Sequence, residues 1–246
     1  MACSKACSRY RSEFEMRNLL SRYHKRLWRG SRNLVNVTRR LLLKHVIPSE
    51  RFCIVSDNCW GGEIYRLLGL EYASPFVGLW ISPATYLHLL ENIENSLTHE
   101  LKFYDDPAFN YPKAILNGTG IGFMHYGSEE EAKEKFIRRL ARFDLDKMFV
   151  KVDFRDPSYV PDDITRWNHL ALPKSVAFVG NKSQLSSVHH AVYLGSDTDY
   201  YYTLKTSLVS YCWWKALREV QPRPLTFFES AVNRIVINDA LPKAPA

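Results

Sequence analysis

The amino-acid sequence predicts an α/β protein with a layered, mostly parallel sheet that one hairpin makes mixed, flanked by helices and preceded by a basic helical arm. Short apolar runs rich in β-forming residues alternate with segments of helical periodicity, a pattern typical of parallel strands joined by helices. Asn117-Gly118 lies between two apolar runs and predicts a hairpin turn. The 246 residues are 46% hydrophobic, which is enough for one sizeable core. We expect the arm over residues 1–46 and one α/β domain over residues 47–246.

Each expected element has a local signal. Apolar β-forming runs predict strands, and helices are predicted where apolar residues recur every three to four positions. Ser82 before Pro83 predicts the start of a long helix, and Ser128 before three glutamates forms a capping box that opens another. The expected strands are 51–58, 74–81, 147–154, 174–181 and 186–195, the hairpin spans 111–128, and the expected helices are 61–70, 82–103, 128 to about 143, 161–172, 200–220 and 224–236.

The basic charge of the chain is concentrated at its N-terminus. Residues 1–45 carry twelve Lys or Arg against two Glu, whereas the remaining 201 residues carry 21 basic and 24 acidic side chains. From Phe14 to Trp28, apolar residues recur at helical spacing with basic residues between them, which predicts a basic amphipathic helix. Such a helix can bind an anionic membrane surface, or it can pack on its own domain with its basic face in water. Nucleic-acid binding is not expected, because no recognised module is present and no basic cluster lies beyond the arm.

The sequence also bears on the cellular location. No apolar stretch reaches the roughly 18–20 residues of a membrane-spanning helix, and the N-terminus lacks the apolar core of a secretory signal. The cysteines form no CxxC pair and are odd in number, so neither a disulfide framework nor a structural zinc site is expected. We expect a cytoplasmic protein with reduced thiols, which could reach the inner face of the cell membrane through its basic arm. The five cysteines are Cys3, Cys7, Cys53, Cys59 and Cys212.

Two polar corners are the candidate functional site. The first is DNCWGG at residues 57–62, and the second is HYGS at residues 125–128, each between an expected strand and an expected helix. In open α/β sheets, ligands bind where the carboxyl ends of parallel strands lead into helices. Glycines and free N–H groups at such a corner suit an anion such as phosphate or carboxylate, although the glycines of a plain turn would look the same. Neither a Walker loop nor a dinucleotide fingerprint is present. The candidate substrate-binding residues are Asn58, Trp60, Gly61, Gly62, Tyr126 and Ser128.

Three residues at these corners are candidate catalytic groups. Cys59, near a helix N-terminus, could attack an acyl group with His125 as its base, or it could pack as a small apolar residue. Asp57 could act as a general base or orient a hydroxyl, or it could cap the following helix. His125 could also be a ring that a neighbouring carbonyl fixes. No metal site is expected, because the spacing of the histidines and cysteines indicates no third ligand. The sequence does not identify a cofactor.

Several segments around the corners form a longer pattern: SDNCWGGEIYRLLGLEYASPFVGLWI, Tyr111-Pro112, FMHYGSEEEAKEKFIRRLARF, VKVDF, ITRWNHL and KSVAFV. This pattern resembles a bacterial family known as domain of unknown function DUF1919. Members of this family are commonly labelled exopolysaccharide or capsule biosynthesis proteins. The resemblance covers about residues 50–180, and it implies an α/β domain that takes part in surface-polysaccharide biosynthesis without bringing an established reaction.

These observations lead to three functional hypotheses. The first is a transferase acting on a nucleotide-sugar, an acyl donor or a lipid-linked saccharide, in which Asp57 or His125 activates a sugar hydroxyl and Gly61-Gly62 holds a donor phosphate. The sequence has no HxxxxD motif of the common acyltransferases. The second is a non-catalytic saccharide-binding accessory protein of the same pathway, with aromatic residues at 200–202 and 213–214 as stacking platforms. The third is a hydrolase that uses Cys59 or Asp57.

Overall fold

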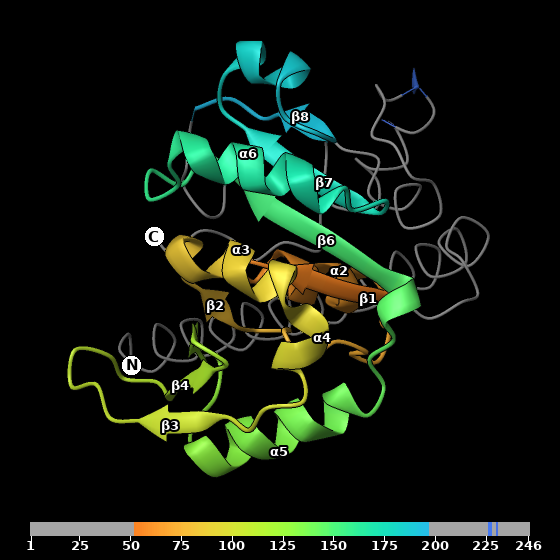
Figure 1. Ribbon diagram of the computed structural model, residues 1–246. Coiled ribbons are helices and arrows are strands. Elements are labelled where there is room, and N and C mark those ends of the chain that lie inside the picture. The colour runs from red at the N-terminus through yellow and green to blue at the C-terminus, as the bar shows by residue number, and fades with distance from the viewer. Residues whose placement is uncertain (1–51, 197–225, 228–229, 231–246) are drawn as a thin grey trace, which may run out of the picture. The chain divides into compact units, whose positions relative to one another are not determined.

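The computed structural model describes residues 52–196, 226–227 and 230, whose arrangement Figure 1 shows. They confirm the predicted α/β class, and their strands form one parallel and one antiparallel sheet with helices beside them. The basic arm and its boundary with the domain lie outside the described residues, as do most of the two helices predicted after residue 199. Within the described ranges, no helix has both the length and the apolar character needed to cross a membrane.

The parallel sheet has the strand order β1-β6-β7-β8. Every residue of β1 and of β7 is buried, which is the pattern of strands that are covered on both faces. The register places Ser56 of β1 beside Lys151 of β6, at the carboxyl end of β1. The strands of this sheet are β1 (Cys53–Ser56), β6 (Met148–Asp153), β7 (Ser175–Val179) and β8 (Ala191–Tyr193). The first three confirm the strands predicted over 51–58, 147–154 and 174–181.

The predicted hairpin belongs to the antiparallel sheet, whose order is β2-β5-β4-β3. Asn117 and Gly118 connect β4 to β5 with φ of 45° and 80°, the two positive values that a type I′ turn requires. The hairpin is not part of the parallel sheet, because its strand β5 pairs with the short strand β2. The strands of this sheet are β2 (Trp80–Ile81), β3 (Lys102–Tyr104), β4 (Lys113–Leu116) and β5 (Thr119–Gly122).

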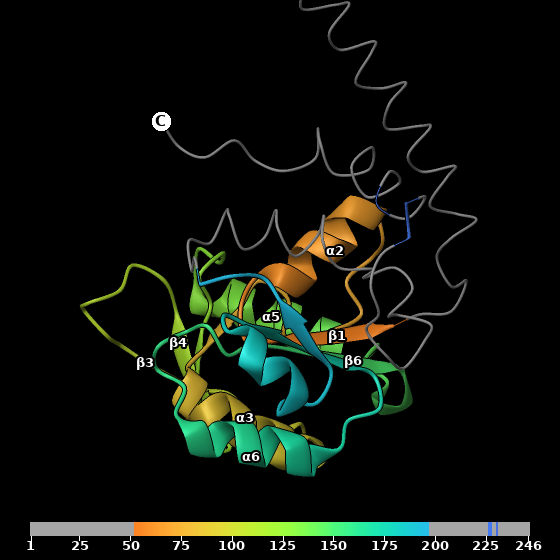
Figure 2. The same ribbon diagram turned by 90° about the horizontal axis from the view of Figure 1, so that it is seen from above.

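Helices cover both faces of the parallel sheet. In Figure 2, α2 lies on one face, and α3 and α6 lie side by side on the other. Helix α2 ends at Gly69, which adopts the left-handed conformation with φ of 64°, the usual geometry of a glycine cap. Helices α2, α5 and α6 confirm the predictions for 61–70, 128–143 and 161–172. The helices are α2 (Trp60–Leu68), α3 (Pro83–Glu91), α4 (Ile93–Ser96), α5 (Glu129–Leu140) and α6 (Pro161–Leu170), with short 3₁₀ helices at Leu145–Lys147 and Lys182–Ser186.

Helix α3 joins the two sheets through one hydrophobic core. The core contains residues of both sheets together with α3, α5 and α6. The hydroxyl of Tyr86, on α3, lies 2.8 Å from the carbonyl oxygen of Lys151 and 3.2 Å from that of Val55. This buried hydroxyl therefore ties α3 to the two neighbouring strands β1 and β6.

The strand predicted over residues 74–81 is wrong for most of its length. Only Trp80–Ile81 forms a strand, and the preceding residues form turns. Ser74 Oγ accepts a hydrogen bond from the backbone N–H of Phe76 at 3.3 Å, and Gly78 has φ of 75°. A side chain that bonds to the nearby backbone and a left-handed glycine both favour a turn over an extended strand.

The long helix predicted over residues 82–103 ends early. The break falls at Asn92, which has φ of −126° and whose side chain donates to the carbonyl oxygen of His88 at 3.1 Å. Residues 102–104 then form β3, because β4 supplies backbone partners that outweigh the local helical pattern. The strand predicted over 186–195 is likewise confined to Ala191–Tyr193, since His190 has φ of 54°.

Gly61 is a glycine because α2 passes close to β1. A Cβ at residue 61 would lie 2.7 Å from Ile54 Cγ2 and 3.1 Å from Ser56 Oγ. Both atoms belong to the buried strand β1. The close contact between helix and strand therefore explains this glycine by packing.

We expect the substitution Gly61→Ala to lower the free energy of unfolding by about 1–3 kcal/mol, because an added methyl group would overpack the contact between α2 and β1. Urea denaturation of the full-length protein measures this loss. The matched control is Gly120→Ala, where an added Cβ would meet no atom within 4 Å. Equal stability of the two variants would contradict the packing explanation.

Candidate functional site

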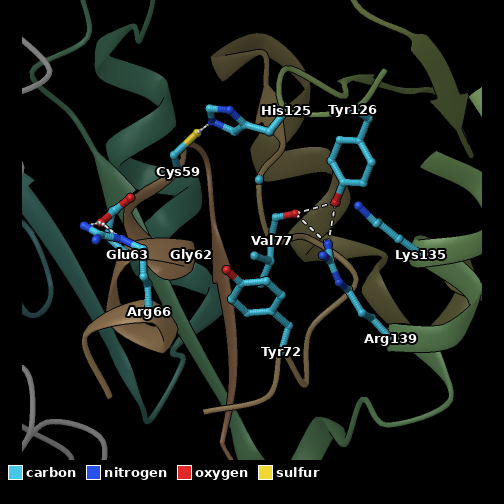
Figure 3. Close-up of a pocket in the computed structure, with 11 residues that line it drawn as sticks. Cys59, Gly62, Glu63, Arg66, Tyr72, Val77, His125, Tyr126, Lys135 and Arg139 are labelled. Atoms are coloured by element: carbon cyan, nitrogen blue, oxygen red, sulfur yellow. Dashed lines mark hydrogen bonds and ion pairs between the residues drawn. The ribbon is translucent and has the colours of Figure 1, made fainter. Parts of the chain in front are cut away.

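The two sequence corners meet at a pocket of about 280 Å³. The pocket is lined by helix α2 with its N-cap, by residues 72–78, by residues 125–126 and by helix α5 (Figure 3). Five of the side chains that line the pocket are basic or acidic, together with a thiol and two phenols. The lining residues are Cys59, Gly62, Glu63, Arg66, Tyr72, Val77, Gly78, His125, Tyr126, Lys135 and Arg139.

A thiol and an imidazole are in contact in this pocket. Cys59 is the N-cap of α2, and His125 follows β5 in the other sheet. Their atoms Sγ and Nε2 are 3.1 Å apart. The thiol donates to Nε2 when His125 carries its own proton on Nδ1. A nucleophile within hydrogen-bond reach of a base is the arrangement that nucleophilic catalysis requires.

The environment of Cys59 keeps its thiol protonated. Burial, reinforced by the nearby Glu63 carboxylate, raises the pKa of Cys59 to about 11, although Lys151 acts in the opposite direction. At neutral pH Cys59 is therefore a thiol and not a thiolate. Attack by this sulfur requires that His125 remove the proton during the reaction.

The first turn of α2 adds a backbone donor to the pocket. The N–H of Trp60 donates to Asn58 Oδ1 at 3.1 Å, and that of Gly61 donates to Ser56 Oγ at 3.3 Å. Among the described residues, the N–H of Gly62 has no acceptor. Because Gly62 lines the pocket, this N–H is available to a negatively charged oxygen close to Cys59.

Asp57 lies outside the pocket, in a buried network of charges. Its Oδ1 accepts from Lys151 Nζ at 2.8 Å, and its Oδ2 accepts from the backbone N–H of Asp153 at 2.9 Å. Tyr159 contributes a longer contact to Oδ2 at 3.4 Å. Burial raises the pKa of Asp57 against the opposing effect of Lys151. Both carboxylate oxygens are thus already bonded, and Asp57 is placed to hold strands together.

Four other predicted site residues have local structural contacts. Asn58 Oδ1 accepts a hydrogen bond from the backbone N–H of Trp60 at the start of α2. Ser128 Oγ caps α5 by accepting from the backbone N–H of Glu131 at 3.2 Å. Trp60 is buried against Phe149 and Phe178. Gly61 packs on β1, as described above. Of the nine predicted residues, the structure brings four to the pocket: Cys59, Gly62, His125 and Tyr126.

Sequence reasoning missed the cationic side of the pocket. Lys135 and Arg139 project from α5 toward Tyr126 (Figure 3). The signal for Arg139 is its spacing, because it follows the buried residues Ala132 and Phe136 on the same face of α5. A charged residue at an apolar position of an amphipathic helix is a candidate for a functional role.

No group of three or more His, Cys, Asp or Glu side chains in the described part of the chain is arranged to hold a metal ion. The pocket presents thiol, imidazole, guanidinium and ammonium groups.

Fold and pocket together define an α/β protein with a cysteine–histidine pair between a parallel and an antiparallel sheet. The chain matches the family described as Domain of unknown function (DUF1919) over residues 31–198, and it belongs to this family. It is 35% identical over 136 residues to a Haemophilus influenzae protein named "Uncharacterized protein". The matched region covers 55% of this chain and 65% of that relative. This match confirms the predicted domain family.

We expect Cys59 to react slowly with iodoacetamide at pH 7 and faster as the pH rises toward about 11, because alkylation requires the thiolate and the pKa of Cys59 is raised to that value. Mass spectrometry of the Cys59 peptide, taken at short reaction times across the pH range, measures the rate at this residue alone. A rate that reaches its plateau near pH 7 would contradict the protonated thiol.

We also expect Asp57→Asn to lower the free energy of unfolding by about 3–5 kcal/mol, because it removes the carboxylate 2.8 Å from the buried Lys151 ammonium and leaves this charge only the longer pair with Asp153 at 3.8 Å. The control is Glu91→Gln, which breaks the partly exposed pair with Arg166 and should cost at most about 1 kcal/mol. Thermal and urea unfolding measure both variants. If Asp57→Asn is as stable as the parent protein, the buried network does not have the structural role assigned to it.

Proposed function

We propose that this protein is a transferase of surface-polysaccharide biosynthesis that passes an acyl group through a thioester on Cys59, with His125 as general base. The observation that carries the proposal is the 3.1 Å contact between Cys59 Sγ and His125 Nε2 in an accessible pocket. The raised pKa of Cys59 supports a mechanism in which the base acts during attack.

The first half-reaction loads the enzyme. His125 Nε2 takes the proton of the Cys59 thiol as sulfur bonds to the carbonyl carbon of the donor, and the carbonyl oxygen becomes negatively charged. The N–H of Gly62 is available to stabilise this oxygen. When the carbonyl re-forms, the bond to the leaving group breaks, and the imidazolium returns its proton to that group. The product is a thioester on Cys59.

The second half-reaction transfers the acyl group. An acceptor hydroxyl loses its proton to His125 as its oxygen bonds to the thioester carbon, and the sulfur departs and regains a proton from the imidazolium. A sugar hydroxyl is the acceptor proposed here, on the basis of the sequence resemblance to exopolysaccharide and capsule proteins. If water is the acceptor, the same steps describe the hydrolase alternative. The aromatic platforms of the saccharide-binding alternative lie outside the described residues.

We expect reactive acetyl donors to acylate Cys59. The full-length protein is incubated separately with p-nitrophenyl acetate, acetyl phosphate and acetyl-CoA, and mass spectrometry follows the acetylated Cys59 peptide over time. Cys59→Ala should give no label at this position. His125→Gln should slow acetylation by about 10²- to 10⁴-fold, the usual contribution of a general base.

Two controls make this experiment specific. His99→Gln removes an exposed histidine that does not line the pocket, so it should acylate at the parental rate. Adding a saccharide acceptor after labelling distinguishes transfer from hydrolysis, since transfer places the acetyl group on the sugar. Equal labelling of Cys59 in the parent and in His125→Gln, or no labelling with any of the three donors, would refute the proposal.

A further inference from the structure

Arg139 differs from every other buried charged residue in the described part of the chain. Six charged side chains are buried there, and five of them form ion pairs: Asp57 with Lys151, Asp153 with Arg155, and Asp163 with the partly exposed Arg166. Arg139 is only 6% exposed, yet no carboxylate of the described residues pairs with it. Its positive charge is therefore not neutralised by the surrounding residues that the structure describes.

Neutral groups hold the guanidinium of Arg139 in place. Its Nη1 donates to the carbonyl oxygen of Val77 at 3.0 Å and to the hydroxyl of Tyr126, and that hydroxyl donates to the same carbonyl at 2.8 Å. The ring of Tyr72 lies 4.8 Å from Arg139 Cζ. These contacts fix the side chain without cancelling its charge. The hydrogen bonds of Arg139 to described residues all use Nη1, which leaves its other N–H groups for a ligand.

An uncompensated buried cation requires an explanation. Burying a charge is costly unless it is paired, and a guanidinium cannot lose its proton at physiological pH. Arg139 lines the same pocket as Lys135 and the free N–H of Gly62. Lys135 is paired with Glu131, and Arg66 is paired with Glu63. The unbalanced positive charge of the pocket thus comes from Arg139, and an anionic ligand would neutralise it.

We propose that Arg139, assisted by Lys135, forms a subsite for the phosphate group of the substrate. A phosphate carries more than one negative charge and has several acceptor oxygens, which matches a guanidinium, an ammonium and a helix N-terminal N–H better than a carboxylate does. This subsite rests on the proposed transferase function, because it identifies the class of donor. The donor is a phosphorylated carrier or an acyl phosphate. Binding of the anion itself does not require Cys59.

The test is a titration of the ¹⁵N-labelled full-length protein with inorganic phosphate, followed by NMR signals of Gly78 and Tyr126. We expect saturable binding to the parent protein and to Cys59→Ala. Arg139→Gln should weaken binding by about tenfold or more, as expected when a charge-assisted contact is lost. Lys135→Gln should weaken it several-fold. The matched control Arg138→Gln removes the neighbouring positive charge on the exposed face of α5 and should leave the affinity unchanged.

The outcomes distinguish the two proposals. Loss of acylation in Cys59→Ala with phosphate binding retained supports the subsite whether or not catalysis is as proposed. Acetate at matched ionic strength should bind at least about tenfold more weakly than phosphate. Equal affinity for acetate, parental affinity in Arg139→Gln, or non-saturable shifts would overturn the phosphate subsite. If Arg139→Gln fails to fold, unchanged affinity in Lys135→Gln overturns it, and a several-fold loss supports it.

Discussion

Asp57 connects the two sheets, and the geometry of the pocket depends on this connection. Its carbonyl oxygen accepts from the backbone N–H of Ile81, in β2, at 3.0 Å. Its carboxylate binds Lys151 Nζ and Asp153 N, both in β6. One residue at the end of β1 thus fixes the antiparallel sheet through its backbone and the parallel sheet through its side chain. Cys59 lies two residues further along the chain, so the contacts of Asp57 also fix the position of Cys59.

The contact between Cys59 and His125 is a consequence of that junction. Cys59 is carried by the turn after β1, and the tight packing of Gly61 on Ile54 fixes the helix that follows. His125 is carried by the segment after β5, and Tyr126 anchors that segment through its hydroxyl bond to Val77. Nucleophile and base therefore come from different sheets, and each is held by buried contacts outside the reacting atoms. Such support favours a fixed geometry for the pair.

The elements with strong local signals could be predicted from the sequence, and those set by distant partners could not. The buried strands, the Asn117-Gly118 turn and the capped helix α5 have signals within a few residues. Strand β3 exists because β4 pairs with it, which local periodicity does not show. The same limit applies to the site. The sequence indicated Cys59 and His125 as chemical groups at two corners. It did not show the buried partner of Asp57, because Lys151 is 94 positions away along the chain. Arg139 looked like one charge among many on α5.

The central claim is that the Cys59 thiol and the His125 imidazole form a functional hydrogen-bonded pair. The most direct test is the ¹⁵N NMR spectrum of the histidine rings in the full-length protein at pH 8, compared with that of Cys59→Ala. The account predicts that His125 Nε2 is an unprotonated acceptor whose resonance shifts when the thiol is removed, while the His99 ring is unaffected. A proton on Nε2, or a His125 resonance that is the same in both proteins, would contradict it.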